Sequence, residues 1–256
     1  MADDRVSRTA TRLVVLTGTL WLCAGCASTR YIDPKADGIL RQMSDTLARA
    51  DAFSVDVRTT RDELIPGGPM VEFTASSTIK LRRPSQLHTS SRGQGRNRAA
   101  WFSGGRLTIL DKARQLYASL ETKRKIDDML DDMLDEYDVE MPAADLLFSN
   151  PYDVLTENVR SGEYIGLHRA GGHDCHHLAF RQETIDWQIW IGADGDALPY
   201  RFVITFLEMT GQPETQVEFA NWDLSPRLSA GQFLFHAPAE ARSVDMDDLF
   251  ADAGVG

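Results

Sequence analysis

The 256-residue chain carries 27 Lys and Arg against 38 Asp and Glu, so its formal net charge is −11 at pH 7. This balance argues against nucleic acid as a partner, because phosphate binding needs a basic surface. A hydrophobic content of 43% is enough for a real core, and the length allows one large or two small domains.

The first 25 residues have the three parts of an export signal. Arg5, Arg8 and Arg12 precede an apolar run over 13–22, which is shorter than the ~20 residues needed to cross a bilayer. The sequence Leu-Cys-Ala-Gly-Cys at 22–26 resembles the bacterial lipoprotein box. We therefore predict a signal peptide over 1–25 and lipidation of Cys26. An ordinary cleaved signal or an uncleaved anchor is the alternative.

The residues around the predicted cleavage point also bear on location and redox state. Ala27 follows Cys26, and in the enterobacterial sorting scheme that the box resembles, a residue other than aspartate favours the outer membrane. We expect a lipid-anchored protein of a Gram-negative envelope that faces the periplasm. Cys23 leaves with the signal and Cys26 is acylated, so Cys175 has no disulfide partner.

We expect a tether over 26–32, a single domain over 33–245 and an acidic tail over 246–256. Asp33 and Pro34 form a helix cap with a first-turn proline. Apolar residues at helical spacing follow, which predicts a helix that ends near Ala50.

From Phe53 onward, apolar residues alternate with polar ones, which is typical of strands with one wet face. Turns rich in glycine and proline separate the segments, so the pattern predicts an antiparallel meander. The expected strands are 53–58, 71–81, 86–91, 98–102, 107–110 and 115–120, and later 162–168, 175–181, 184–191, 200–208, 215–223 and 232–235.

A helix over about 123–137 is predicted between the two groups of strands, because its apolar residues fall on one stripe. The opposite face is acidic, and the acidic residues crowd the helix end, where the macrodipole disfavours them. We infer that tertiary contacts hold this helix. Its methionines suit a mobile cover over an apolar surface. Two short helical pieces follow, one from Pro142 to Phe148 and one capped by Asn150.

The segment 173–177 is the one cluster that resembles a metal site, because alternation aims His173, Cys175 and His177 to one side. Same-face neighbours on a strand lie ~7 Å apart, so the three cannot easily reach one ion. Solvent histidines beside a small buried thiol are the simpler interpretation. The sequence has no G-x-S-x-G, H-E-x-x-H or P-loop motif, so we expect no metal, no cofactor and no enzyme activity.

Four segments resemble a family of predicted periplasmic proteins, the domain of unknown function 2092: His-Leu-Ala-Phe-Arg at 177–181, Ile-Asp-Trp-Gln-Ile-Trp-Ile at 185–191, the segment 199–205, and Phe-Ala-Asn-Trp at 219–222. The resemblance covers about 39–243, and Asp-Trp-Gln is its most specific mark. The family is similar in expected fold to the lipoprotein carriers LolA and LolB, in which helices plug a curved antiparallel half-barrel that holds acyl chains. The resemblance therefore implies an α+β half-barrel with helices covering its concave face, and it carries over no catalytic residues.

The leading hypothesis is a non-enzymatic carrier or receptor for a lipid, an acylated protein or another hydrophobic ligand. A buried acyl chain gains ~0.8 kcal/mol per methylene, which supplies ample affinity. An ordinary hydrophobic core is the alternative explanation of the same surface. The predicted cavity lining is Phe73, Trp101, Trp187, Ile189, Phe202, Ile204 and Phe206, and the predicted lid is Ile126, Met129, Met133 and Leu134.

Two other classes of function remain open. One is an envelope interaction or sensing module in which the acidic helix meets a basic partner. The other is a small metal-dependent or hydrolytic enzyme that uses Cys175 with His177.

Overall fold

A computed structural model describes residues 30–94, 96–137 and 143–251. Within these ranges, thirteen strands form one sheet in the order β1-β8-β9-β10-β11-β12-β2-β3-β4-β5-β6-β7-β13. Neighbours are antiparallel except at the two ends, where β1 runs parallel to β8 and β13 runs parallel to β7. The predicted signal peptide and Cys26 lie outside the described residues.

The strands fall into two meanders joined by the pairing of β12 with β2. The first comprises β2 (Ala52–Leu64), β3 (Met70–Arg82), β4 (Gln86–Gly93), β5 (Arg96–Ser103), β6 (Arg106–Asp111) and β7 (Leu116–Glu121). The second comprises β8 (Ser161–Ala170), β9 (His173–Arg181), β10 (Ile185–Gly192), β11 (Pro199–Phe206) and β12 (Glu214–Asp223). The outermost strands are β1 (Tyr31–Ile32) and β13 (Arg242–Ser243).

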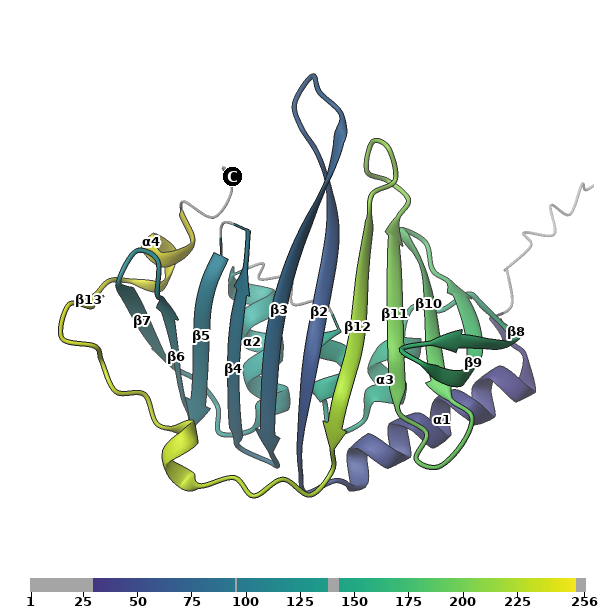
Figure 1. Ribbon diagram of the computed structural model, residues 1–256, viewed down its shortest axis with the longest axis horizontal. Coiled ribbons are helices and arrows are strands. Elements are labelled where there is room, and N and C mark those ends of the chain that lie inside the picture. The colour runs from purple at the N-terminus through teal and green to yellow at the C-terminus, as the bar shows by residue number, and fades with distance from the viewer. Residues whose placement is uncertain (1–29, 95, 138–142, 252–256) are drawn as a thin grey trace, which may run out of the picture.

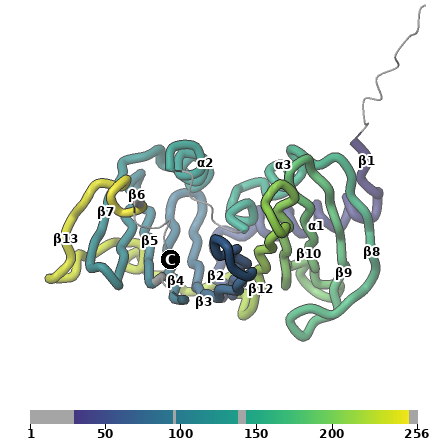
Figure 2. Tube along the Cα trace, turned by 90° about the horizontal axis from the view of Figure 1, so that it is seen from above, coloured from purple at the N-terminus to yellow at the C-terminus, as the bar shows by residue number. Residues whose placement is uncertain are grey.

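The sheet is curved, and the main helices lie on its concave side (Figures 1 and 2). These are α1 (Pro34–Arg49), α2 (Ile126–Tyr137), the short η1 (Ala144–Leu147) and α3 (Pro151–Thr156). The prediction of an α+β half-barrel with helices over its concave face is confirmed. No helix in the described ranges has the length and apolar character to span a bilayer.

Helix α1 begins where the sequence predicts. One oxygen of Asp33 accepts from the backbone N–H groups of Lys35, at 2.7 Å, and Ala36, at 3.1 Å. These bonds satisfy donors that a helix start leaves free. The apolar stripe of α1 is fully buried against the sheet and its neighbours, and consists of Ala36, Leu40, Met43 and Leu47.

The C-terminal part of the chain departs from the sequence-based expectation. Residues 232–235, expected as a strand, fall partly in the 3₁₀ turn η2 (Ala230–Phe233), where Phe233 is buried beside Arg82. Residues 246–251, expected in a tail, form α4 (Met246–Ala251). Met246 and Leu249 pack into the main core, so this segment is part of the fold.

Both outer edges of the sheet are partly covered by short strands. β1 pairs with the start of β8, and β13 pairs with the start of β7 after the chain has passed along the rim of the sheet (Figure 1). Unpaired edges invite association with other chains, so these two-residue strands shield the positions where the sheet would otherwise end.

Replacing Phe102, whose side chain is fully buried in the main cluster, tests whether the concave face is the core. We expect Phe102→Ala to lower the free energy of unfolding by ~3–5 kcal/mol, because it leaves a large cavity. Urea denaturation measures this. The control Leu234→Ala removes a side chain that is 51% exposed. It should change stability by ~0.5 kcal/mol or less, and equal losses in both variants would contradict the assignment.

Candidate functional site

The concave face of the sheet is a continuous apolar surface. On β10, Trp187 and Ile189 lie directly opposite Ile204 and Phe202 of β11. Phe180 of β9 stacks on Trp187 with ring centroids 4.0 Å apart. Residues paired across antiparallel strands point to the same face, so these side chains form one patch.

Six of the seven predicted lining residues share this face. Trp187, Ile189 and Phe202 are at most 2% exposed and belong to the main core. Phe73, Ile204 and Phe206 are half-buried. The fold brings these six side chains together on one face. Their role in binding a ligand stays a prediction.

Trp101 is the member that the fold places elsewhere. Its neighbour Phe102 pairs with Leu87 and Leu107 inside the core, so Trp101 points to the convex face. There it stacks on His88 at 5.0 Å and contacts Phe235 at 5.1 Å. Trp101 therefore does not line the concave surface.

Helix α2 covers part of the concave face. Ile126, Met129 and Met133 are 1–2% exposed and pack into the core. Leu134, predicted to belong to the same lid, is 57% exposed and points away. The helix therefore contributes three of the four predicted contacts.

Charges on α2 repel one another, but polar contacts also tie the helix to its neighbours: Asp132 accepts a hydrogen bond from Thr122 and pairs with Lys123 at 3.5 Å. The pKa of Asp131 is raised by burial and by repulsion from Asp135 and Asp127 on the same helix. The last turn has no basic residue to complement the macrodipole. Asp127 does accept a 3.0 Å hydrogen bond from the backbone of Ser149. Burial of apolar side chains and these few polar contacts therefore hold this helix together.

Burial falls along the concave face toward the β2–β3 turn. On β2, the inward-facing Phe53, Val55 and Val57 are buried, whereas Thr59 and Arg61 are only half-buried. The same change occurs on β3, where Leu81 is buried and Phe73 is half-buried. One end of this surface is therefore closed by helices and the other is more accessible. The inward position of Arg61 was not recognised from the sequence, although the alternation begun at Phe53 reaches it.

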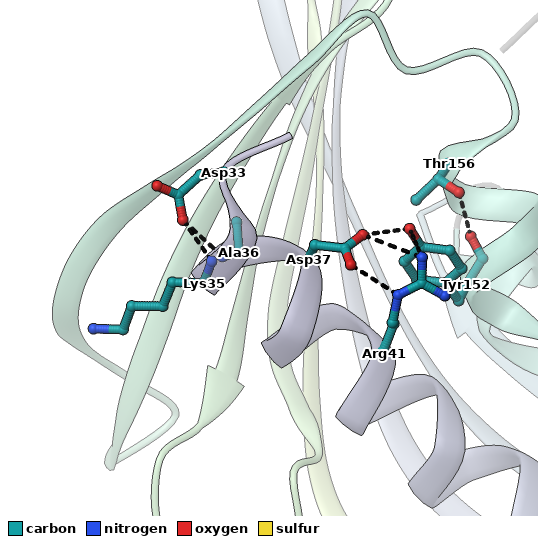
Figure 3. Close-up of polar contacts among 7 residues, drawn as sticks. All are labelled: Asp33, Lys35, Ala36, Asp37, Arg41, Tyr152 and Thr156. Atoms are coloured by element: carbon teal, nitrogen blue, oxygen red, sulfur yellow. Dashed lines mark hydrogen bonds and ion pairs between the residues drawn. The ribbon is translucent and has the colours of Figure 1, made fainter. Parts of the chain in front are cut away.

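Polar contacts tie helix α1 to helix α3, as Figure 3 shows. Arg41 donates to Asp37 at 2.8 Å and to the Tyr152 hydroxyl of α3 at 2.7 Å, and that hydroxyl donates to Asp37. Burial alone would raise the pKa of Asp37, but the hydrogen bonds from Arg41 and Tyr152 outweigh it and lower the pKa. These contacts line a shallow hollow of about 610 Å³ beside the first described residues.

The histidine and cysteine side chains of the segment 173–177 are engaged in contacts within the sheet. Cys175 is buried and its thiol lies 3.9 Å from the Ala170 carbonyl. Burial raises the pKa of this thiol, which disfavours the nucleophilic thiolate. His177 contacts His168 at 2.9 Å and Gln188 at 3.0 Å instead. Within the described ranges, no three His, Cys, Asp or Glu side chains are placed to hold a metal ion.

Comparison with known proteins gives a family match and several distant structural likenesses. Residues 36–247 match the family described as "Predicted periplasmic protein (DUF2092)". Lipoprotein LppX of Mycobacterium tuberculosis is 16% identical with a TM-score of 0.48, over 76% of this chain and 97% of that chain. LprF from Mycobacterium bovis is 14% identical with a TM-score of 0.47, over 82% and 99%. A LolA superfamily protein from Nitrosomonas europaea is 9% identical with a TM-score of 0.37, over 78% and 97%. A search of curated proteins finds no match.

The surroundings of His177 give a testable pH dependence. Burial lowers the pKa of His177, and the hydrogen bond with Gln188 only partly opposes this. As pH falls through ~6.5, the unfolded chain takes up a proton that the folded chain does not, so stability falls. We expect His177→Gln to show a smaller loss of unfolding free energy than the parent between pH 7.5 and 5.5. His236→Gln, at an exposed position, is the control and should behave as the parent does.

Proposed function

Because the chain belongs to the DUF2092 family of predicted periplasmic proteins, we propose that it is a periplasm-facing lipoprotein that binds a hydrophobic ligand on its concave face. The ligand is a lipid, an acylated protein or another molecule with an acyl chain. The protein acts as a carrier or receptor rather than as an enzyme, and a lipid on Cys26 anchors it to the outer membrane.

The observation that carries this proposal is a continuous apolar face, part of which is covered by a helix through buried isoleucine and methionine side chains. Three side chains of α2, Ile126, Met129 and Met133, fill the surface above the sheet. Methionine is flexible and polarisable, so it can exchange one apolar neighbour for another at low cost. A ligand chain can therefore replace α2 on the sheet.

The free energy gained by burying a ligand chain is similar to the free energy lost by exposing the side chains of α2. An acyl chain that buries ten methylenes gains roughly 8 kcal/mol at ~0.8 kcal/mol each. Displacing α2 exposes a few methionine and isoleucine side chains, at ~1.5–3 kcal/mol each. The two sums are comparable, so ligand binding and helix closure can compete.

Native mass spectrometry tests the proposal directly. The chain from Ala27 onward contains every described residue and is purified without detergent. We expect a defined extra mass that organic solvent releases and whose fragments contain an acyl chain. A clean mass that takes up neither added fatty acid nor added lipopeptide would contradict a hydrophobic ligand.

Trimming the accessible end of the surface should weaken uptake without unfolding the protein. We expect Ile204→Ala combined with Phe206→Ala to bind added fatty acid more weakly, because both side chains are half-buried on the concave face. The control combines Leu167→Ala with Met209→Ala, which are 60% and 55% exposed. Calorimetric titration measures binding, and equal affinities in both variants would show that the pocket lies elsewhere.

The acidic surface of α2 favours a second candidate, an envelope module that binds a basic partner. Asp131, Asp135 and Glu136 are all exposed on this helix. A basic partner would relieve the repulsion that raises the pKa of Asp131.

Charge reversal separates this candidate from the first. Lysine at positions 131, 135 and 136 should abolish capture of a basic protein partner in a pull-down from envelope extract, because the attractive charges are lost. A matched triple reversal at Asp194, Asp196 and Glu208, which are exposed on turns, should leave capture intact. Retained capture by the α2 variant would count against the interaction module.

A further inference from the structure

The positively charged side chain of Arg61 lies among apolar side chains of the concave face, in a row of residues that pair across neighbouring strands. Phe73 pairs with Arg61, and Arg61 pairs with Thr215. Thr215 in turn pairs with Ile204, and Ile204 with Trp187. Paired residues share a face, so the Arg61 side chain lies in line with three of the predicted lining residues.

The guanidinium of Arg61 has hydrogen-bonding capacity to spare. One terminal nitrogen donates to Glu63, two residues along on the same strand face. Its Nε is buried and has no hydrogen-bond partner among the described residues. A buried donor without an acceptor is unfavourable, so an incoming oxygen atom gains from a group that is already desolvated.

The inward-facing side chains of β2 change from apolar at one end of the strand to charged at the other. Inward-facing residues run from Phe53, Val55 and Val57, which are buried and apolar, to Arg61 and Glu63, which are half-buried and charged. A ligand that matches this gradient has an apolar chain at one end and a charged group at the other.

We infer that Arg61 recognises the anionic head group of an amphiphile whose acyl chain lies along the concave face toward Phe53. This inference rests on the proposed function and names the ligand class for the same surface. A carboxylate or a phosphate fits the guanidinium, because both accept two parallel hydrogen bonds from its fork. Glu63 occupies part of the fork in the free protein and competes with the head group.

Calorimetric titration with three ligands of equal chain length tests the inference on the chain from Ala27 onward. The probes are laurate, dodecyl phosphate and dodecanol. We expect at least one anionic ligand to bind about tenfold or more tightly than dodecanol. The anion that binds more tightly identifies a carboxylate or a phosphate head group. Arg61→Met should remove this preference, so that laurate and dodecyl phosphate bind no more tightly than dodecanol.

Two further variants separate recognition from a structural role. Glu63→Gln should strengthen anion binding, because it removes the competing carboxylate, whereas loss of a purely structural ion pair would not. Arg58→Met is the matched control on the same strand. Arg58 is exposed and, by alternation, points to the convex face, so all three affinities should stay as in the parent.

The outcomes distinguish this inference from the proposed function. If the parent binds all three ligands equally, or if Arg61→Met keeps the preference, the role of Arg61 is wrong while the hydrophobic site stands. If the parent binds none of them, the proposed function fails and the inference falls with it. Should Arg61→Met not fold, the opposite effect expected of Glu63→Gln still decides the matter.

Discussion

An open curved sheet with one apolar face is stable only if something covers that face. The concave side buries large aromatic side chains, such as Phe53, Phe102 and Trp187, and exposing them to water would cost more than the marginal stability of a domain. Helices α1 and α2, with α3 and η1, supply the cover. The edge strands and the C-terminal segment along the rim lie outside this contact between helices and sheet.

The two main covering helices do this work in different ways. α1 is capped by Asp33 and tied to α3 through Arg41 and Tyr152, so it has several polar contacts that fix its position. α2 places acidic residues where its dipole disfavours them, and combines buried isoleucine and methionine side chains with polar contacts of Asp127 and Asp132. Core and proposed binding surface are therefore one surface, on which α1 packs against β10 and α2 lies over the first meander (Figure 2).

Alternation and helical spacing predicted most elements because these patterns are strong where one face is buried, and the half-barrel followed from the resemblance to a family. The sequence-based prediction placed six concave residues together but also included Trp101. Trp101 and Phe102 are adjacent aromatic residues, and only the register with β4 and β6 decides which of them faces inward. Arg61 was missed because a charged residue does not fit an apolar pattern, and its surroundings come from strands β3 and β12, the latter far away in the chain. The helix α4 was missed because its acidic residues make the segment look like a solvent-exposed tail, although Met246 and Leu249 are buried.

The pairing of β12 with β2 also limits the order in which the strands of the sheet can pair during folding. Phe219 pairs with Val57, and Thr215 with Arg61, so the seam between the two meanders joins segments at opposite ends of the domain. Contacts between distant segments form slowly, because the loop between them must first lose its conformational freedom. A chain that emerges N-terminus first therefore holds β2 without one of its two neighbours until nearly all of the domain has appeared. The central seam can therefore close only after most of the domain has been made.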